Sequence, residues 1–261
     1  MTTVIKRNKW EIWRDVIFAL FVREIRTGFN DKLGLSWAVV SPIAFIFMLS
    51  FVRGRLGGEL THSIPTFVFM AYGMIFIQTF LQTLSACSNS IKKNQSLFAF
   101  RQVKPISAVL AAGIFELLVK VFVIMGILFV MFLMGIEIKI DDPLMLLIYT
   151  VSLWWLATML GMLFALGIMY IPEVNKIQGL LTRPLFFLSG VFFSIQDIPR
   201  EYWPYLNWNP ILHAIELSRY AAYTSYGNEG VSSKFFFSVL LVTTFITLSC
   251  YHSYWRQAIS R

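Results

Sequence analysis

Two apolar stretches in the middle of the chain decide its fold class: residues 106–134, ISAVLAAGIFELLVKVFVIMGILFVMFLM, and residues 144–171, LMLLIYTVSLWWLATMLGMLFALGIMYI. The first contains two ionisable side chains, Glu116 and Lys120, and the second contains no Asp, Glu, Lys or Arg. A helix needs about 20 apolar residues to cross a hydrocarbon layer roughly 30 Å thick. Each stretch therefore predicts one membrane-spanning helix.

Four further apolar stretches predict spans at residues 33–52, 64–86, 177–195 and 235–254. The composition agrees, because 57% of the residues are hydrophobic and 14% are charged, whereas soluble domains carry roughly 25% charged residues. The sequence therefore predicts an all-α polytopic membrane protein with six transmembrane helices. Residues 1–261 should form a single transmembrane domain, since six spans leave no room for a separate soluble one.

Basic residues are distributed unevenly between the two sides of these spans. If the N-terminus is cytoplasmic, fifteen of the twenty-two Lys and Arg residues lie in cytoplasmic segments. Basic residues favour the cytoplasmic side, so both termini are predicted to be cytoplasmic. The net charge of +8 then reflects contact with anionic lipid headgroups, and no nucleic-acid partner is needed to explain it.

The N-terminal segment, residues 1–32, precedes spans one to five, which occupy residues 33–195. Within it, residues 10–28 contain too many charged residues to cross a membrane, yet Trp10, Trp13 and other apolar residues recur at helical spacing. This pattern predicts an amphipathic helix on the inner membrane surface. The helix is either a simple anchor or a lever at the cytoplasmic face.

The predicted loop between spans two and three, residues 88–105, has four basic residues and no acidic ones. Apolar residues such as Phe98 and Phe100 occur in a short segment that ends at Pro105. We expect a short cytoplasmic helix whose apolar face docks a partner protein. The alternative is an ordinary basic loop at the lipid surface.

Glu116 and Lys120 lie four residues apart inside span three, so the spacing predicts an ion pair on one helix face. Ionisable groups at membrane depth usually face a bundle interior or an aqueous path. The pair is therefore either structural or a contact to the transported substrate.

Residues 196–234 form a polar and aromatic segment between spans five and six. Asn209 and Pro210 are typical of a helix start, and a short amphipathic helix is expected to dip into the outer leaflet after them. Its polar residues recur every three positions and are predicted to face a pore, while the tryptophans suit the membrane interface. The candidate gate residues of this segment are Trp203, Trp208, His213, Glu216 and Arg219.

Catalytic patterns are lacking in the sequence. Residues 54–58 are glycine-rich but lack the Lys and Ser/Thr of a nucleotide-binding loop, which excludes ATP hydrolysis by this chain. The three histidines have no ligand partners at useful spacing, so no metal site is expected. A membrane-embedded transferase would need clustered acidic or histidine residues at one membrane face, which makes that class a weaker alternative.

Three motifs, taken in order, resemble the ABC-2 type transporter permeases. They are REIRTGF at residues 23–29 with LGLSWAVVSP at 33–42, RPLFFLSGVFF at 183–193, and WNPILHAIELSR at 208–219. Among these permeases the chain is most similar to those of capsular polysaccharide export. The resemblance implies a bacterial inner-membrane homodimer that exports a polysaccharide, with re-entrant periplasmic helices between spans five and six. Exporters of O-antigen, teichoic acid or a drug on the same scaffold are the alternative.

The resemblance also implies partners: a separate ABC ATPase subunit that uses ATP and Mg, and periplasmic and outer-membrane export proteins. No cofactor is expected in this chain. The residues expected to contact the ATPase are Arg23, Arg26, Gln95, Leu97, Phe98, Phe100, Arg101 and Val103. Because sugars pack their C–H faces on aromatic rings, and basic residues attract an acidic polymer, the candidates for the substrate path are Trp37, Arg53, Arg55, Tyr72, Glu116, Lys120, Tyr149, Trp154 and Trp155.

Overall fold

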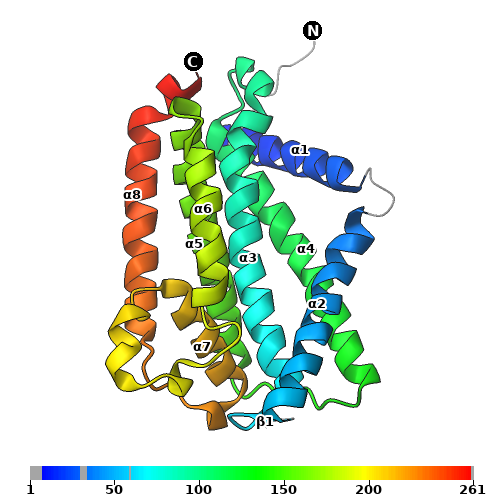
Figure 1. Cartoon of the computed structure of the whole chain (residues 1–261). Helices are drawn as coiled ribbons and strands as arrows, with labels where there is room; N and C mark the ends of the chain where they lie inside the picture. Colours follow the sequence, from blue (N-terminus) through cyan, green and yellow to red (C-terminus); the bar gives the residue numbers. More distant parts are fainter. Residues whose placement is uncertain (1–7, 30–33, 59, 260–261) are drawn as a thin grey trace.

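The computed structural model describes residues 8–29, 34–58 and 60–259, which form eight α-helices, four short 3-10 helices and one small hairpin (Figure 1). The predicted start of the N-terminal segment at residue 1, the predicted start of span one at residue 33 and the predicted end of the domain at residue 261 lie outside these ranges. The hairpin pairs β1 (Leu60–Thr61) with β2 (Ile64–Pro65). The α-helices are α1 (Lys9–Phe29), α2 (Gly34–Gly57), α3 (Thr66–Lys93), α4 (Pro105–Leu133), α5 (Pro143–Tyr170), α6 (Val174–Leu188), α7 (Pro210–Ala222) and α8 (Ser233–Ile259).

A helix lies at each of the six predicted spans, but the helices differ in length and hydropathy. Four of them, α3, α4, α5 and α8, are long and apolar enough to cross a membrane. The apolar part of α2 is limited to Val40–Gly54, and α6 has 15 residues, which corresponds to about 22 Å at a rise of 1.5 Å per residue. The all-α polytopic membrane class is confirmed, and the count of six spans stays a prediction.

Helix α3 lies at the centre of the bundle and packs closely against α4 and α5. A Cβ on Gly161 of α5 would lie 2.5 Å from the Cβ of Cys87 on α3, so only glycine permits this approach. On α4, a Cβ on Gly113 would lie 3.0 Å from the Thr158 hydroxyl of α5. Small residues at helix crossings are the usual means of close packing in membranes, where burial from water contributes little between helices.

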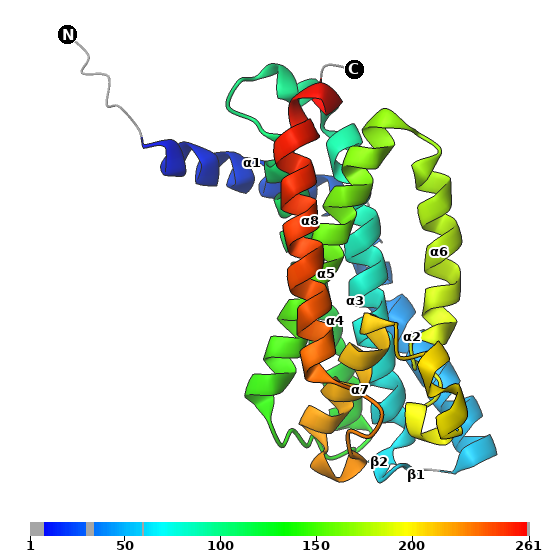
Figure 2. The ribbon, with the colours of Figure 1, turned by 90° about the vertical axis from the view of Figure 1, so that its left-hand side faces the viewer.

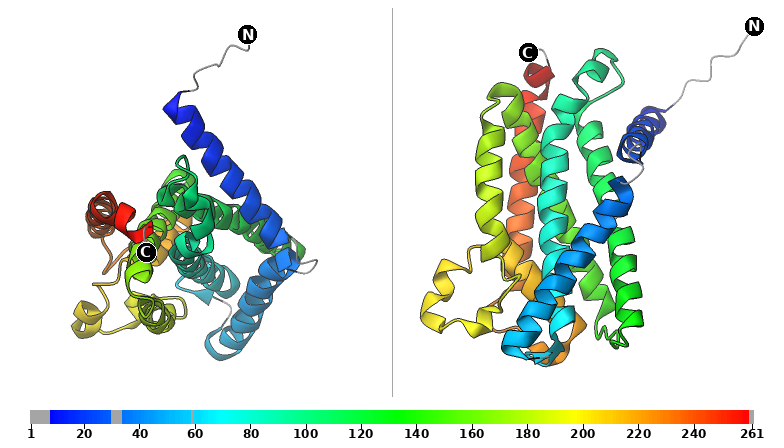
Figure 3. Two further views of the ribbon diagram at one scale, coloured as in Figure 1. Left: turned by 90° about the horizontal axis from the view of Figure 1, so that it is seen from above. Right: turned by 45° about the vertical axis from the view of Figure 1, so that its right-hand side comes forward.

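The two ends of the bundle differ in structure. At one end, α1 crosses the other helices almost at right angles, and the link between α3 and α4 and the last turns of α8 lie nearby (Figures 1 and 2). At the opposite end, α7, the hairpin and the connection from α6 to α7 close the bundle (Figure 3). We call these the α1 end and the α7 end.

The fifth predicted span ends earlier than expected. Helix α6 stops at Leu188 instead of residue 195, because Gly190 adopts a φ of +73° that breaks the helix. The chain then turns back through two 3-10 helices, Ile195–Asp197 and Arg200–Tyr205, before α7 begins. The region between the end of α6 and the start of α7 is therefore formed by several short segments.

The close crossing of α3 and α5 predicts a strong effect of one added methyl group. Gly161→Ala should lower the free energy of unfolding in detergent micelles by about 1–3 kcal/mol, the usual cost of overpacking. Gly54→Ala is the matched control, because a Cβ there meets nothing within 4 Å. Equal stability of the two variants would contradict the packing at this crossing.

Candidate functional site: a polar groove between α3 and α6

Helix α6 turns its polar face toward the bundle and its apolar face outward. Asn175, Gln178, Gly179 and Thr182 share one face at helical spacing and line a hollow of about 460 Å³ against α3. Ser85 of α3 lies on the other side of this hollow. The hollow is also lined by Leu81, Arg183, Phe186 and Phe187. We call it the α3–α6 groove.

The opposite face of α6 consists of large apolar side chains. Ile177, Leu180 and Leu181 are exposed, Leu180 to 72%. A soluble amphipathic helix buries its apolar face, and α6 does the reverse. In a membrane, this orientation places apolar residues toward lipid or another apolar surface and polar residues toward a polar path.

Gln178 is the polar group of the groove with an unmet hydrogen bond. Its side chain is 4% exposed, and its Oε1 has no hydrogen-bond partner among the residues that the structure describes. A buried carbonyl oxygen without a donor costs roughly 1–3 kcal/mol. Because buried polar groups without a hydrogen-bond partner are rare in native proteins, Gln178 is the best candidate in the groove for contact with a polar ligand.

The polar residues of the groove are not among the site residues predicted from the sequence. Asn175, Gln178 and Thr182 follow a helical period in the sequence, and the last two lie in the stretch 177–195 that its hydropathy predicts to be a span. The signal that could have identified them is a polar stripe within an otherwise apolar helix. Their position against Ser85 needed the tertiary structure.

The predicted pair of Glu116 and Lys120 does not form an ion pair within 4.0 Å in the described part of the chain. Lys120 is buried and instead donates a hydrogen bond to Gln82 of α3. Glu116 lies in a different hollow, beneath α1. Neither residue lines the α3–α6 groove.

The five aromatic candidates for the substrate path are not gathered around one cavity. Trp154 donates from Nε1 to the carbonyl of Gly113, 2.7 Å away, and Trp155 donates to Thr244 of α8. Tyr149 is buried and bonds Ser233. These three residues join neighbouring helices, while Trp37 is exposed on α2 and Tyr72 lines a small apolar cavity at the α7 end.

The polar residues of α7 have partners within the chain, and their role as gate residues stays a prediction. Arg219 is fully buried. Its Nη1 donates to the carbonyl of Gly190 at 2.8 Å and to Glu216 Oε1 at 2.9 Å, and its Nη2 donates to the carbonyls of Phe69 and Val191 at 3.1 Å. Only its Nε has no partner among the described residues.

The second carboxylate oxygen of Glu216 extends this network. Oε2 accepts hydrogen bonds from the hydroxyls of Tyr226, at 2.8 Å, and Ser194, at 3.1 Å. Arg219 and Glu216 thus join α7 to α3, to the turn after α6 and to the segment before α8. We call this set the Arg219 network.

The remaining gate candidates also have partners within the chain. His213 is buried, its Nε2 lies 2.9 Å from the carbonyl of Asn207, and its Nδ1 accepts from the backbone N–H of Ser232. Burial lowers the pKa of His213 below its ordinary value, because it disfavours the charged ring. Trp203 donates to the carbonyl of Ile198, and Trp208 is 60% exposed.

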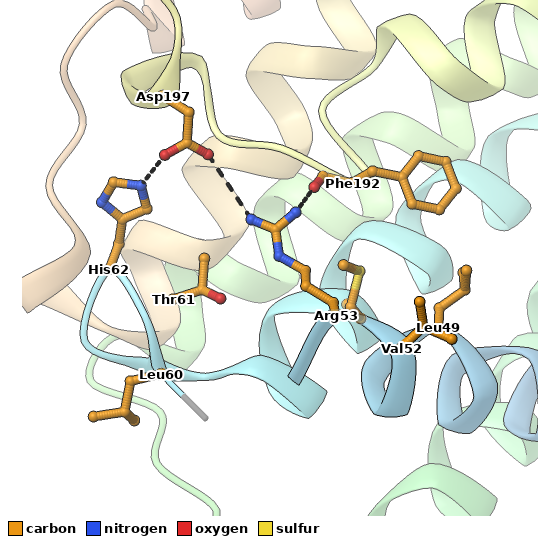
Figure 4. Close-up of a pocket in the computed structure, with 9 residues that line it drawn as sticks. Leu49, Val52, Arg53, Leu60, Thr61, His62, Phe192 and Asp197 are labelled. Carbon is orange, nitrogen blue, oxygen red and sulfur yellow. Dashed lines mark hydrogen bonds and ion pairs between the residues drawn. The ribbon is translucent and has the colours of Figure 1, made fainter. Parts of the chain in front are cut away.

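A second ionic cluster closes the α7 end (Figure 4). Arg53, at the end of α2, and His62, in the hairpin, both point toward Asp197, with His62 Nε2 2.6 Å from its Oδ1. Arg53 also bonds the carbonyl of Phe192. Burial alone would raise the pKa of Asp197, but hydrogen bonds from Ser194 and His62 and the charge of Arg53 hold it below its ordinary value.

This cluster changes the interpretation of Arg53, whereas the Arg55 side chain lies outside the described part of the structure. Arg53 is engaged by Asp197 and Phe192, so its charge is largely satisfied within the chain. Arg55 belongs to the last turn of α2.

At the α1 end, α1 is attached to the link between α3 and α4. Arg23 donates to Asn94 Oδ1 at 3.0 Å, and Glu24 forms an ion pair with Lys93 at 2.5 Å. The two regions predicted to contact an ATPase therefore lie side by side. Arg26 is exposed on the same helix.

The predicted docking segment contains a 3-10 helix, Gln95–Ala99, followed by Phe100, and its two aromatic residues differ in burial. Phe98 is 8% exposed and packs with Leu20 in the core, whereas Phe100 is 65% exposed. Phe98 therefore cannot serve as a docking contact in this conformation. Gln95 and Arg101 are exposed, and Leu97 and Val103 are half-buried.

No group of three or more His, Cys, Asp or Glu residues that could hold a metal ion occurs in the described ranges.

Comparison with known proteins decides the family. The model of the ABC-2 type transporter family matches residues 15–223. The chain belongs to the ABC-2 type transporter family. The match includes α7 and most of α1, so it covers the α3–α6 groove and, except for Tyr226, the Arg219 network.

Three relatives extend over most of the chain. The chain is 34% identical to the polysialic acid transport protein KpsM of Escherichia coli, over 95% of this chain and 96% of the relative. It is 27% identical to the capsule polysaccharide export inner-membrane protein CtrC of Neisseria meningitidis, over 84% of each chain. It is 26% identical to BexB of Haemophilus influenzae, another capsule polysaccharide export inner-membrane protein, over 78% of each chain.

The Arg219 network predicts a large loss of stability when one partner is removed. Arg219→Met should lower the free energy of unfolding by about 3–5 kcal/mol, because Glu216 is left as an uncompensated buried charge. Combining it with Glu216→Leu should recover part of this loss. Unfolding in mixed micelles measures both.

Arg200→Met provides the control for this prediction. Arg200 pairs with Glu229 at 3.0 Å, but the two side chains are 78% and 65% exposed, and exposed pairs contribute at most about 1 kcal/mol. A loss of the same size in Arg200→Met and Arg219→Met would show that burial of the network is not the cause.

Proposed function

We propose that this chain is the permease subunit of an ATP-driven exporter that moves capsular polysaccharide across the bacterial inner membrane. The names of the relatives, which specify capsule polysaccharide export or polysialic acid transport, support this assignment. The α3–α6 groove is the structural observation that supports this assignment, because polar side chains along one face of a membrane helix favour a polar ligand. Amides and hydroxyls such as Gln178, Asn175 and Thr182 can exchange hydrogen bonds with sugar hydroxyls.

The groove is open on one side in a single chain, which suits a path completed by a second copy. A homodimer would face two such grooves across a common axis. The outward apolar face of α6 would then contact lipid or the other subunit. Exporters of another cargo on this scaffold, such as O-antigen, teichoic acid or a drug, remain the second candidate, favoured by the same groove.

The α1 end is the proposed cytoplasmic side. Lys92, Lys93, Arg101 and Lys104 cluster there, and basic residues favour the cytoplasm. Both termini would be cytoplasmic, all six helices α2–α6 and α8 would contribute to six spans, and α7 with its neighbours would form a re-entrant periplasmic segment. Periplasmic and outer-membrane export proteins would act on the α7 end.

A separate ABC ATPase is the proposed partner at the α1 end. Phe100 and Arg101 are exposed on the link between α3 and α4, and Arg23 joins this link to α1 through Asn94. A displacement of the link by the ATPase would therefore also displace α1. In this arrangement ATP and Mg are bound by the partner.

The coupling surface can be tested by charge reversal. Phe100→Asp with Arg101→Glu should weaken binding of the ATPase about tenfold or more, as expected when interface anchors are lost, without loss of thermal stability. Co-purification of the ATPase measures binding, and surface and intracellular polysaccharide in a strain that lacks this gene measure export.

Lys234→Glu is the control, because Lys234 is an exposed residue at the start of α8, at the α7 end. It should leave binding and export unchanged. If the double variant binds the ATPase normally, the docking surface lies elsewhere.

The groove assignment predicts that stability and export change in opposite directions. Gln178→Leu removes a buried carbonyl oxygen that lacks a donor, so the unfolding temperature should stay the same or rise. Export should fall several-fold, with polymer accumulating inside the cell, because a polar contact to the cargo is lost.

Thr247→Val is the matched control, since the Thr247 hydroxyl on α8 is also buried without a described partner but lies outside the groove. It should not affect export. If Gln178→Leu exports normally, the groove is not the cargo path; if surface polysaccharide does not depend on the gene at all, the cargo is a different molecule.

A further inference from the structure

A second polar hollow lies beneath α1 and is separate from the α3–α6 groove. It has a volume of about 380 Å³ and is lined by residues of α1, α3 and α4. Ser85 is the one described residue that lines both hollows. The polar residues that line the hollow beneath α1 are Glu24, Thr27, Ser85, Asn89, Ser90, Lys93 and Glu116.

The charges around this hollow are not all paired. Glu24 and Lys93 form an ion pair at 2.5 Å, and the Lys93 side chain is 48% exposed. Lys120, one turn deeper on α4, donates to Gln82. Glu116 forms no hydrogen bond or ion pair with any residue described by the structure, although it lies half-buried in the hollow.

The position of α1 sets the depth of the hollow. Trp10 and Phe18 are 71% and 65% exposed on a helix that also carries Glu11, Arg14 and Asp15. Such a helix lies in the plane of the membrane interface, with its apolar side chains toward the acyl chains. The hollow beneath it is therefore at the level of the lipid headgroups.

We propose that this hollow binds the headgroup of an aminophospholipid, with the ammonium group on Glu116 and the phosphate near Lys93. An ammonium group carries three N–H donors, and the Glu116 carboxylate accepts no hydrogen bond from any residue that the structure describes. Two carboxylates and one lysine disfavour a purely anionic headgroup, and the Lys93 ammonium disfavours a bare metal ion. The site is independent of the cargo proposed above.

A bound headgroup would contact α1, α3 and α4 at once. Glu24 and Thr27 belong to α1, Lys93 to α3 and Glu116 to α4. The lipid would therefore help to fasten α1 to the bundle, next to the contact between Arg23 and Asn94.

Native mass spectrometry of the full chain in mixed micelles tests this proposal. The probes are phosphatidylethanolamine, phosphatidylcholine and phosphatidylglycerol in equal amounts. We expect phosphatidylethanolamine to be retained about tenfold better than phosphatidylcholine, because the methylated nitrogen of phosphatidylcholine donates no hydrogen bond. A tenfold difference in retention corresponds to the loss of one hydrogen bond to a charged group. Phosphatidylglycerol should be retained no better than phosphatidylcholine.

Variants locate the preference. Glu116→Gln should abolish the preference for phosphatidylethanolamine, and Glu116→Asp should keep part of this preference because the charge remains. Glu137 is an exposed acidic residue between α4 and α5, so Glu137→Gln should leave the preference intact. Equal retention of the three lipids by the wild type, a preference for phosphatidylglycerol, or an unchanged preference in Glu116→Gln would each overturn the proposal. Glu116→Asp and the wild-type comparison decide the outcome even if Glu116→Gln fails to fold.

Discussion

The absence of hydrogen-bond partners in the lipid hydrocarbon is the constraint on which this structure depends. Polar groups within the bundle must find partners inside the chain or lie beside a polar path. The Arg219 guanidinium shows the first solution, since it donates to Glu216 and to the carbonyls of Gly190, Phe69 and Val191, with a longer contact to that of Phe193 at 3.5 Å. It also lies 3.5 Å from the centroid of the Phe69 ring. This network fixes α7 against α3 and defines the shape of the α7 end.

Polar groups that lack a partner then become informative. His213, Lys120 and Arg219 are bonded within the chain, so they are best understood as structural. Gln178 and Glu116 are different, because no described residue donates a hydrogen bond to the buried carbonyl of the first or to the carboxylate of the second, although the charge of Lys120 acts on Glu116. The two lie in separate hollows on either side of Ser85. The proposed cargo path and the proposed lipid site follow from this contrast.

The α1 end combines a rigid attachment with an exposed contact. Glu24–Lys93 and Arg23–Asn94 attach α1 to the link between α3 and α4, while Phe100 projects from that link. Because α3 is the central helix, a displacement of this link would reach both the groove, which lies along the half of α3 nearer the α1 end, and the Arg219 network near its other end. A partner bound at the α1 end could therefore displace α3 and the helices packed against it.

The sequence by itself determined the membrane class, the approximate position of each helix and the family, because long apolar segments and ordered motifs are local properties of the chain. It placed the helix start at Asn209, whose side chain does accept the N–H of Ile211. It could not determine which polar residues find partners, since those partners lie far away in sequence, as Phe69 does from Arg219. The direction in which α6 faces, the inward turn of Phe98 and the separation of Glu116 from Lys120 were decided by tertiary packing, because helical periodicity defines a face but not what lies opposite it.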